Sequence, residues 1–218
     1  MMTHALLKTC VAAATLCLSP SMVLASPLVW DWSPATTGAT VTDGWTNQNP
    51  GQHFAEKVSF ATGKNIDGMD IYSLDSFGSV GSPVKITIWA DSSDQPGAVL
   101  GQFSSSVSII DTLGAAAGET RKHADFSGFA MLANTTYWIG MAGDGFDLTQ
   151  TGLTGFAGGD SVMAQFNSDD TFTVFTGTGV GDMAFRLYGA SVPEPATLTL
   201  FGLGLAGLFA NRRKPRAN

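Results

Sequence analysis

Pairs of closely spaced aspartates are the residues of this sequence most able to do chemistry. Three such pairs stand in segments rich in turn-forming residues: Asp91 and Asp94, Asp144 and Asp147, Asp169 and Asp170. Carboxylate oxygens are the ligands that Ca²⁺ prefers, and the run from Asp144 to Asp147 is the most loop-like of the three. No pair follows the EF-hand pattern, and aspartate is also favoured in solvated turns. We therefore take Asp144 and Asp147 as candidate Ca²⁺ ligands, with solvated turns as the alternative.

The tryptophans are the second group with a chemical use. Trp30, Trp32 and Trp45 gather early in the chain, whereas Trp89 and Trp138 stand in strand-like runs. Exposed aromatic rings can stack on the faces of sugars, but aromatic side chains more often bury their large area in a core. We predict core positions for Trp89 and Trp138, and the early trio stays open between the core and a sugar platform.

Catalytic arrangements are poorly supported. A glycosidase needs two carboxylates about 5 to 10 Å apart, yet Glu56 and Glu119 are the two glutamates between the chain ends. Each stands next to or near a basic residue, which predicts a surface position. A pair of aspartates in the place of the two catalytic carboxylates is an open alternative. His53 and His123 could serve a serine triad or zinc, but there is no G-x-S-x-G motif and no third zinc ligand is indicated. We expect no enzyme activity.

The elements that would position these residues are short strands. Several runs alternate apolar and polar residues with period two, as strands with one buried face do. About nine strands separated by turn clusters predict an all-β fold with a single β-sandwich, in which a jelly roll is one arrangement. The predicted strands are 54–60, 69–74, 84–89, 99–110, 125–130, 137–141, 161–166, 171–175 and 183–188. The segment 113–119 reads as a loop, and ten glycines between Gly140 and Gly181 predict long loops at one end.

The charge of the central segment argues against a nucleic-acid partner. Residues 26–190 contain 15 Asp and two Glu against four Lys and two Arg, a net charge of −11, compared with −7 for the whole chain. Such a surface repels nucleic acid and anionic membranes. It suits extracellular life or cation binding, and 165 residues suit one domain.

The first 25 residues have the features of a signal peptide. Lys8 precedes an apolar run over 9–18, and Val23-Leu24-Ala25 offers the small residues that a signal peptidase reads. Cleavage after Ala25 would start the mature chain at Ser26. Both cysteines, Cys10 and Cys17, lie in this leader, so the mature domain would contain neither a thiol nor a disulfide.

The last 28 residues, 191–218, are predicted to form a membrane tail. The apolar stretch over 196–210 has 15 residues, fewer than the about 20 that a membrane-spanning helix usually needs. As a helix it would be roughly 22 Å long. The basic residues Arg212, Arg213 and Lys214 would hold its end in the cytoplasm by the positive-inside bias. We expect a short transmembrane helix over 196–210 that local bilayer thinning accommodates.

This tail resembles a PEP-CTERM sorting tail. Val192-Pro193-Glu194-Pro195 precedes the Gly- and Leu-rich stretch, and Arg212-Arg213-Lys214-Pro215 follows it. The resemblance covers residues 192–218 and implies that Pro193, Glu194 and Pro195 are the recognition signal of an exosortase, an integral-membrane protease. It further implies a bacterial envelope protein of the kind often associated with exopolysaccharide or biofilm production.

Three function classes follow. The first is an exported protein, passing through the inner membrane to the cell surface or medium, with a structural or binding role in exopolysaccharide. The second is a calcium-dependent glycan-binding module, which the aspartate pairs and tryptophans favour. The third, a polysaccharide hydrolase, has the weakest support because no catalytic pair stands out.

Overall fold

The computed structural model of the chain describes residues 26–46, 53–74, 78–145, 148–166, 171–177 and 181–192. Nearly all of its regular structure is β-strand, and the single helix is the short turn α1 (Pro34–Thr37). Every strand pairing among these residues is antiparallel. The prediction of an all-β fold is confirmed.

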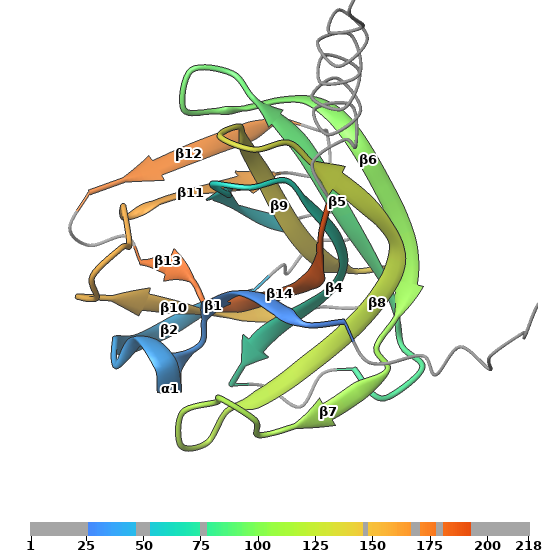
Figure 1. The fold of residues 1–218 in the computed structure, drawn as a ribbon. Coiled ribbons are helices and arrows are strands. Elements are labelled where there is room, and N and C mark those ends of the chain that lie inside the picture. Colours follow the sequence, from blue (N-terminus) through green and yellow to red (C-terminus); the bar gives the residue numbers. More distant parts are fainter. Residues whose placement is uncertain are drawn as a thin grey trace, which may run out of the picture.

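The strands form two larger sheets and a small one (Figure 1). The five-stranded sheet has the order β1 (Leu28–Trp32), β14 (Phe185–Ser191), β4 (Lys64–Ser73), β8 (Thr120–Met131), β7 (Ile109–Asp111). The six-stranded sheet has the order β12 (Phe172–Thr176), β11 (Val162–Phe166), β3 (His53–Ser59), β9 (Thr136–Gly143), β5 (Pro83–Asp91), β6 (Pro96–Ser106). The small sheet has the order β13 (Asp182–Met183), β10 (Thr149–Thr154), β2 (Thr40–Thr46).

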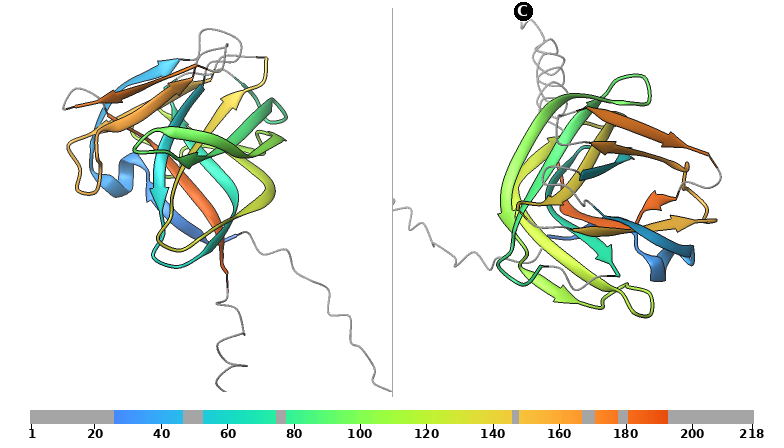
Figure 2. Two further views of the ribbon diagram at one scale, coloured as in Figure 1. Left: turned by 90° about the horizontal axis from the view of Figure 1, so that it is seen from above. Right: turned by 180° about the vertical axis from the view of Figure 1, so that it is seen from behind.

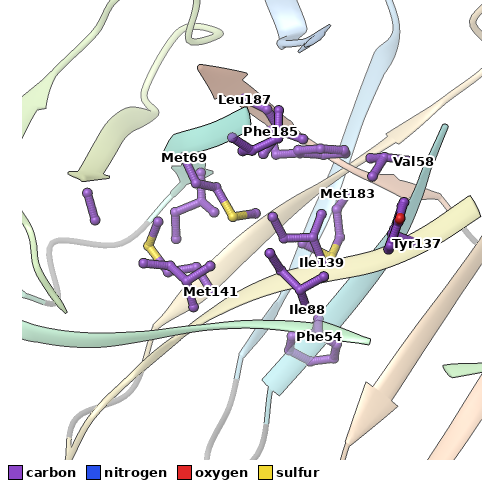
Figure 3. Packing of buried hydrophobic residues seen from close by; sticks show 14 of the residues in the cluster. Phe54, Val58, Met69, Ile88, Tyr137, Ile139, Met141, Met183, Phe185 and Leu187 are labelled. Carbon is purple, nitrogen blue, oxygen red and sulfur yellow. The ribbon is translucent and has the colours of Figure 1, made fainter. Parts of the chain in front are cut away.

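One apolar core joins the two larger sheets (Figure 3). Met69, Phe185 and Leu187 come from the five-stranded sheet, and their neighbours in the cluster include Ile88 and Ile139 of the six-stranded sheet. All five side chains are fully buried. Each such side chain stabilises the fold by about 1.5–3 kcal/mol. The core exists because the period-two alternation places these residues on one face of each strand.

The small sheet and α1 lie on the same side of the molecule (Figure 2). The sheet also belongs to the core, since Met183 of β13 is buried in the main cluster. On its other face, Leu153 of β10 packs with Tyr72 and Ala184. The segment between Gly140 and Gly181 contains β11 and β12 close to the predicted strands 161–166 and 171–175, and it also contains β10, where we expected a long loop.

Candidate functional site

Three carboxylates from distant parts of the chain meet beside the core. Glu56 lies on β3, Asp160 precedes β11, and Asp182 lies on β13. Each offers a carboxylate oxygen, and these oxygens all lie within 4.8 Å of one another. The β3–β11 pairing accounts for part of this approach, because Met163 lies opposite Glu56 three residues after Asp160. We refer to Glu56, Asp160 and Asp182 as the carboxylate cluster.

Backbone amides hold the carboxylate cluster in place. Glu56 accepts hydrogen bonds from the amides of Lys57 at 2.8 Å and Met183 at 3.0 Å. Asp182 accepts hydrogen bonds from the amides of Asp160 at 3.0 Å and Ser161 at 2.9 Å. The cluster therefore ties the start of β11 and β13 to β3, and its oxygens are fixed by the main chain.

Negative charge in the carboxylate cluster is only partly compensated. Glu56 is fully buried, and burial raises its pKa well above the ordinary value although two amides oppose the shift. Burial also raises the pKa of Asp182. The Lys57 ammonium lies 2.6 Å from Asp160 and 3.1 Å from Asp94. Three carboxylate oxygens so close together are suited to a hard cation such as Ca²⁺, which takes oxygen ligands.

The surface position predicted for the two glutamates is wrong. Glu56 is 0% exposed, because it alternates with Phe54 and Val58 and shares their inward face on β3. Glu119 is 2% exposed and accepts a hydrogen bond from the amide of Ala116 at 2.9 Å. A charged residue at an inward position of an alternating strand was the sequence signal that would have found Glu56.

Among the described residues, the aspartates of the pairs chosen from the sequence are not members of the carboxylate cluster. Asp144 is exposed just after β9, while Asp147 lies outside the described residues, so their pairing stays a prediction. Asp169 and Asp170 also lie outside the described residues. Asp91 instead accepts a hydrogen bond from the Trp138 indole at 2.9 Å. Its neighbour Asp94 forms the ion pair with Lys57 described above.

His123 lies between two carboxylates. Its Nδ1 is 2.6 Å from Asp70, its Nε2 is 3.0 Å from Asp125, and Asp70 also accepts a hydrogen bond from the Tyr188 hydroxyl at 2.6 Å. Burial opposes the charged imidazole, but these hydrogen bonds and charges outweigh it and raise the pKa of His123. With both nitrogens engaged by acids, this imidazole is not placed as the base of a serine nucleophile. The side chain of His53 lies outside the description.

The core positions predicted for Trp89 and Trp138 are confirmed, since these residues are 3% and 0% exposed. They pack in a second cluster, with Ala55, Ala164 and Phe166, on the outer face of the six-stranded sheet. The Lys57 ammonium lies 5.7 Å from the Trp138 ring centre.

Of the three early tryptophans, the structure describes the side chains of Trp30 and Trp32. Trp30 and Trp32 are partly buried against the main core, and the Trp30 ring is stacked on Phe185 with 6.2 Å between the ring centres. They also line a shallow pocket of about 240 Å³ together with Lys57 and Asp160. Trp45 belongs to β2, but its side chain lies outside the description.

A larger groove opens on the outer face of the six-stranded sheet. Its volume is about 380 Å³. Seven residues of β5, β6, β11 and β12 line it: Thr87, Trp89, Gly97, Val99, Gln102, Phe166 and Phe172. We call this the outer-face groove. Its lining contains no charged side chain, and it is therefore distinct from the carboxylate cluster.

The C-terminal end of the chain is similar to a known sorting motif. Residues 191–214 match the model of the PEP-CTERM protein-sorting motif. The chain carries a PEP-CTERM sorting motif. The PEP-CTERM motif indicates a protein that is exported and sorted by an exosortase toward the cell surface. No curated protein matches the chain.

The predicted features of both ends lie outside the described residues. These are the leader over 1–25, the signal residues Pro193, Glu194 and Pro195, the helix over 196–210 and the basic end. Within the residues that the structure describes, no helix has both the length and the apolar character to cross a membrane.

Proposed function

We propose that this protein is a non-catalytic component of an extracellular polysaccharide matrix, delivered to the cell surface by an exosortase. The PEP-CTERM motif over 191–214 is the observation that carries the proposal. In this proposal signal peptidase removes residues 1–25, and residues 191–218 form a sorting tail that crosses the inner membrane transiently. Residues 26–190 form the exported domain, with the two larger sheets as the layers of a β-sandwich.

The surface of the domain supports this role. Acidic residues outnumber basic ones by 11 between residues 26 and 190, which favours solubility outside the cell. The antiparallel sheets hold the chain in a rigid frame, on which a groove can keep its shape without a disulfide. Both are properties that a binding or structural component of a polysaccharide gel requires.

Replacing Glu194 tests the sorting half of the proposal. In the producing bacterium, Glu194→Ala should leave the full-length precursor in the membrane fraction, because the exosortase no longer reads its signal. Immunoblotting with an antibody against the domain measures the precursor and the shorter product. Ser106→Ala, at an exposed position of β6 outside the matched motif, is the control and should be processed like the wild type.

The matrix half is tested on the same cells. The processed protein should co-purify with the exopolysaccharide and remain with it after washing in low salt. Normal processing of Glu194→Ala, or a wild-type protein found free in the medium, would contradict the corresponding half of the proposal.

Calcium-dependent glycan binding is the second candidate, favoured by the carboxylate cluster, in which two buried acids and Asp160 face one ammonium. If the cluster binds Ca²⁺, the cation stabilises the folded state by mass action. The melting temperature should then rise by several degrees with millimolar Ca²⁺ and fall again with chelator. Glu56→Gln, which keeps the shape of the side chain, should abolish the rise.

The controls separate this candidate from simple charge repulsion. Asp125→Asn removes a largely exposed charge on β8, a strand that holds no member of the carboxylate cluster, and should keep the rise. A wild-type protein whose melting temperature and glycan affinity ignore Ca²⁺ would remove the candidate, and Glu56→Gln would then raise stability by relieving repulsion between the acids.

A further inference from the structure

The outer-face groove has the composition of a small-molecule site. Ligand sites typically enclose about 300–1,000 Å³ and combine apolar walls with a few polar groups. The groove, at about 380 Å³, falls in that range, whereas the pocket beside Trp30, at about 240 Å³, does not. Its walls are three aromatic rings and Val99, and its polar side chains are Thr87 and Gln102.

The sheet explains why the groove exists. Thr87 and Trp89 alternate with Ile86 and Ile88, which point into the core, so the first two face outward. Between β5 and β11 the outward row passes over small residues, since Thr87 pairs with Gly140 and Ala55 pairs with Ala164. The ring of Phe166 can therefore reach Trp89 and stack on it at 4.4 Å between ring centres.

The rim of the groove is open to solvent. Val99 is 56% exposed and Phe172 is 38% exposed, whereas Trp89 and Phe166 beneath them are nearly buried. The Phe172 ring lies 5.6 Å from Phe166, measured between the ring centres. The ring of a ligand that enters the groove would therefore contact Phe172 first, and the buried pair Trp89 and Phe166 would support Phe172 from below.

The polar groups of the groove suit hydroxyls. Gln102 donates through Nε2 to the Thr87 hydroxyl at 3.4 Å, which is long for a hydrogen bond. An amide and a hydroxyl can each donate and accept. Both can therefore pair with the vicinal hydroxyls of a sugar, while a purely apolar ligand would leave them unsatisfied.

Charge selects among sugars. The groove itself is uncharged, and the domain around it has a net charge of −11 between residues 26 and 190. A uronate or sulfated sugar would be repelled by this field and would find no cation in the lining. We propose that the outer-face groove binds a neutral hexose unit of a polysaccharide, with Phe172 stacking on the sugar face and Gln102 and Thr87 pairing with its hydroxyls.

This inference rests on the proposed matrix function and names its binding site. The test uses the processed protein purified from the producing bacterium, in chelator so that calcium plays no part. Isothermal titration calorimetry measures binding of four neutral tetrasaccharides (cellotetraose, laminaritetraose, maltotetraose and mannotetraose) and of tetragalacturonate as the anionic probe. At least one neutral probe should bind, and tetragalacturonate should not.

The chain offers a matched pair for the stacking residue. Phe172 and Phe175 stand on the same strand and are both 38% exposed, but only Phe172 lines the groove. Phe172→Ser should weaken binding of the neutral probe by about fivefold, the usual worth of an aromatic contact. Phe175→Ser should leave the affinity unchanged.

A second pair tests the polar contact. Gln102→Met keeps the length of the side chain and should weaken binding, while Gln95→Met in the exposed turn between β5 and β6 should not. Equal effects within either pair, tighter binding of tetragalacturonate, or no binding of any neutral probe would overturn the groove assignment. If the protein still co-purifies with exopolysaccharide in those cases, the matrix function stands and only its site is wrong.

Discussion

At the scale of single residues, the molecule places charge inside and pairs it with the main chain or with other charges. Arg121 bonds both Asp111, at 2.6 Å, and the fully buried Asp70, at 3.3 Å. Arg186 is held by Asp31 at 2.9 Å. These bonds lie on the outer face of the five-stranded sheet, opposite the side that packs on the core. Each half of such a pair depends on the other, because removing one leaves an uncompensated buried charge.

The ion pairs of His123 should make the stability of the fold depend on pH. The groups facing His123 are Asp70 on β4, Asp125 on β8 and Tyr188 on β14, and Arg121 bonds the same Asp70. Its pKa is raised in the folded state, so the folded protein holds this proton more tightly than the unfolded chain. The resulting stability is fully present below about pH 6.5, the ordinary value for histidine, and is lost as the pH rises through the raised pKa.

Urea unfolding between pH 5 and pH 9 measures this loss. The wild type should lose stability above about pH 6.5, while His123→Gln should be less stable at low pH by roughly 2 kcal/mol and show a shallower slope, to which the raised pKa values of Glu56 and Asp182 still contribute. Asp144→Asn, which changes an exposed charge, should keep the wild-type slope. A slope in His123→Gln as steep as in the wild type would contradict the role given to His123.

At the scale of elements, alternation was a good guide and its failures have physical causes. The runs around Ile86, Ile139 and Phe185 became core strands, because each has one apolar face. Three strands were missed: β1, β2 and β10. In β10 five consecutive residues from Thr149 are buried although several are polar, so neither face reads as apolar. The short β1 is an edge strand whose tryptophans are two apart, too few to show a period.

Most of the candidate site could not be predicted from the sequence. Glu56 and Asp182 belong to different sheets and are more than a hundred residues apart, and no spacing rule encodes their approach. The outer-face groove is likewise lined by strands from the two halves of the six-stranded sheet: β11 and β12 from one half, β5 and β6 from the other. Only the burial of Trp89 and Trp138 could be predicted, because ring size alone favours it.

Gly140 shows how closely the central strands approach. A Cβ atom built on Gly140 would overlap the carbonyl oxygen of Phe54 on β3. The Gly140→Ala variant must therefore push β9 away from β3, and it should cost about 3 kcal/mol in the free energy of unfolding. Chemical denaturation measures this cost.

Gly63 is the matched control for that substitution. A Cβ atom there would meet ordinary contacts, with Met131 at 3.4 Å and Val192 at 3.6 Å. Gly63→Ala should be neutral or slightly stabilising, because alanine restricts the unfolded chain. Equal costs for the two variants would contradict the close approach at Gly140.

At the scale of the whole molecule, the first and last strands that the structure describes, β1 and β14, lie side by side. Leu28 of β1 lies opposite Tyr188 of β14, and β14 in turn lies between β1 and β4. The five-stranded sheet therefore cannot close until residue 188 has followed residue 28 across the membrane. Contacts so distant in sequence form slowly. For a chain exported as the sorting motif indicates, we expect folding of this sheet to be completed only after the segment that precedes the motif has crossed the membrane.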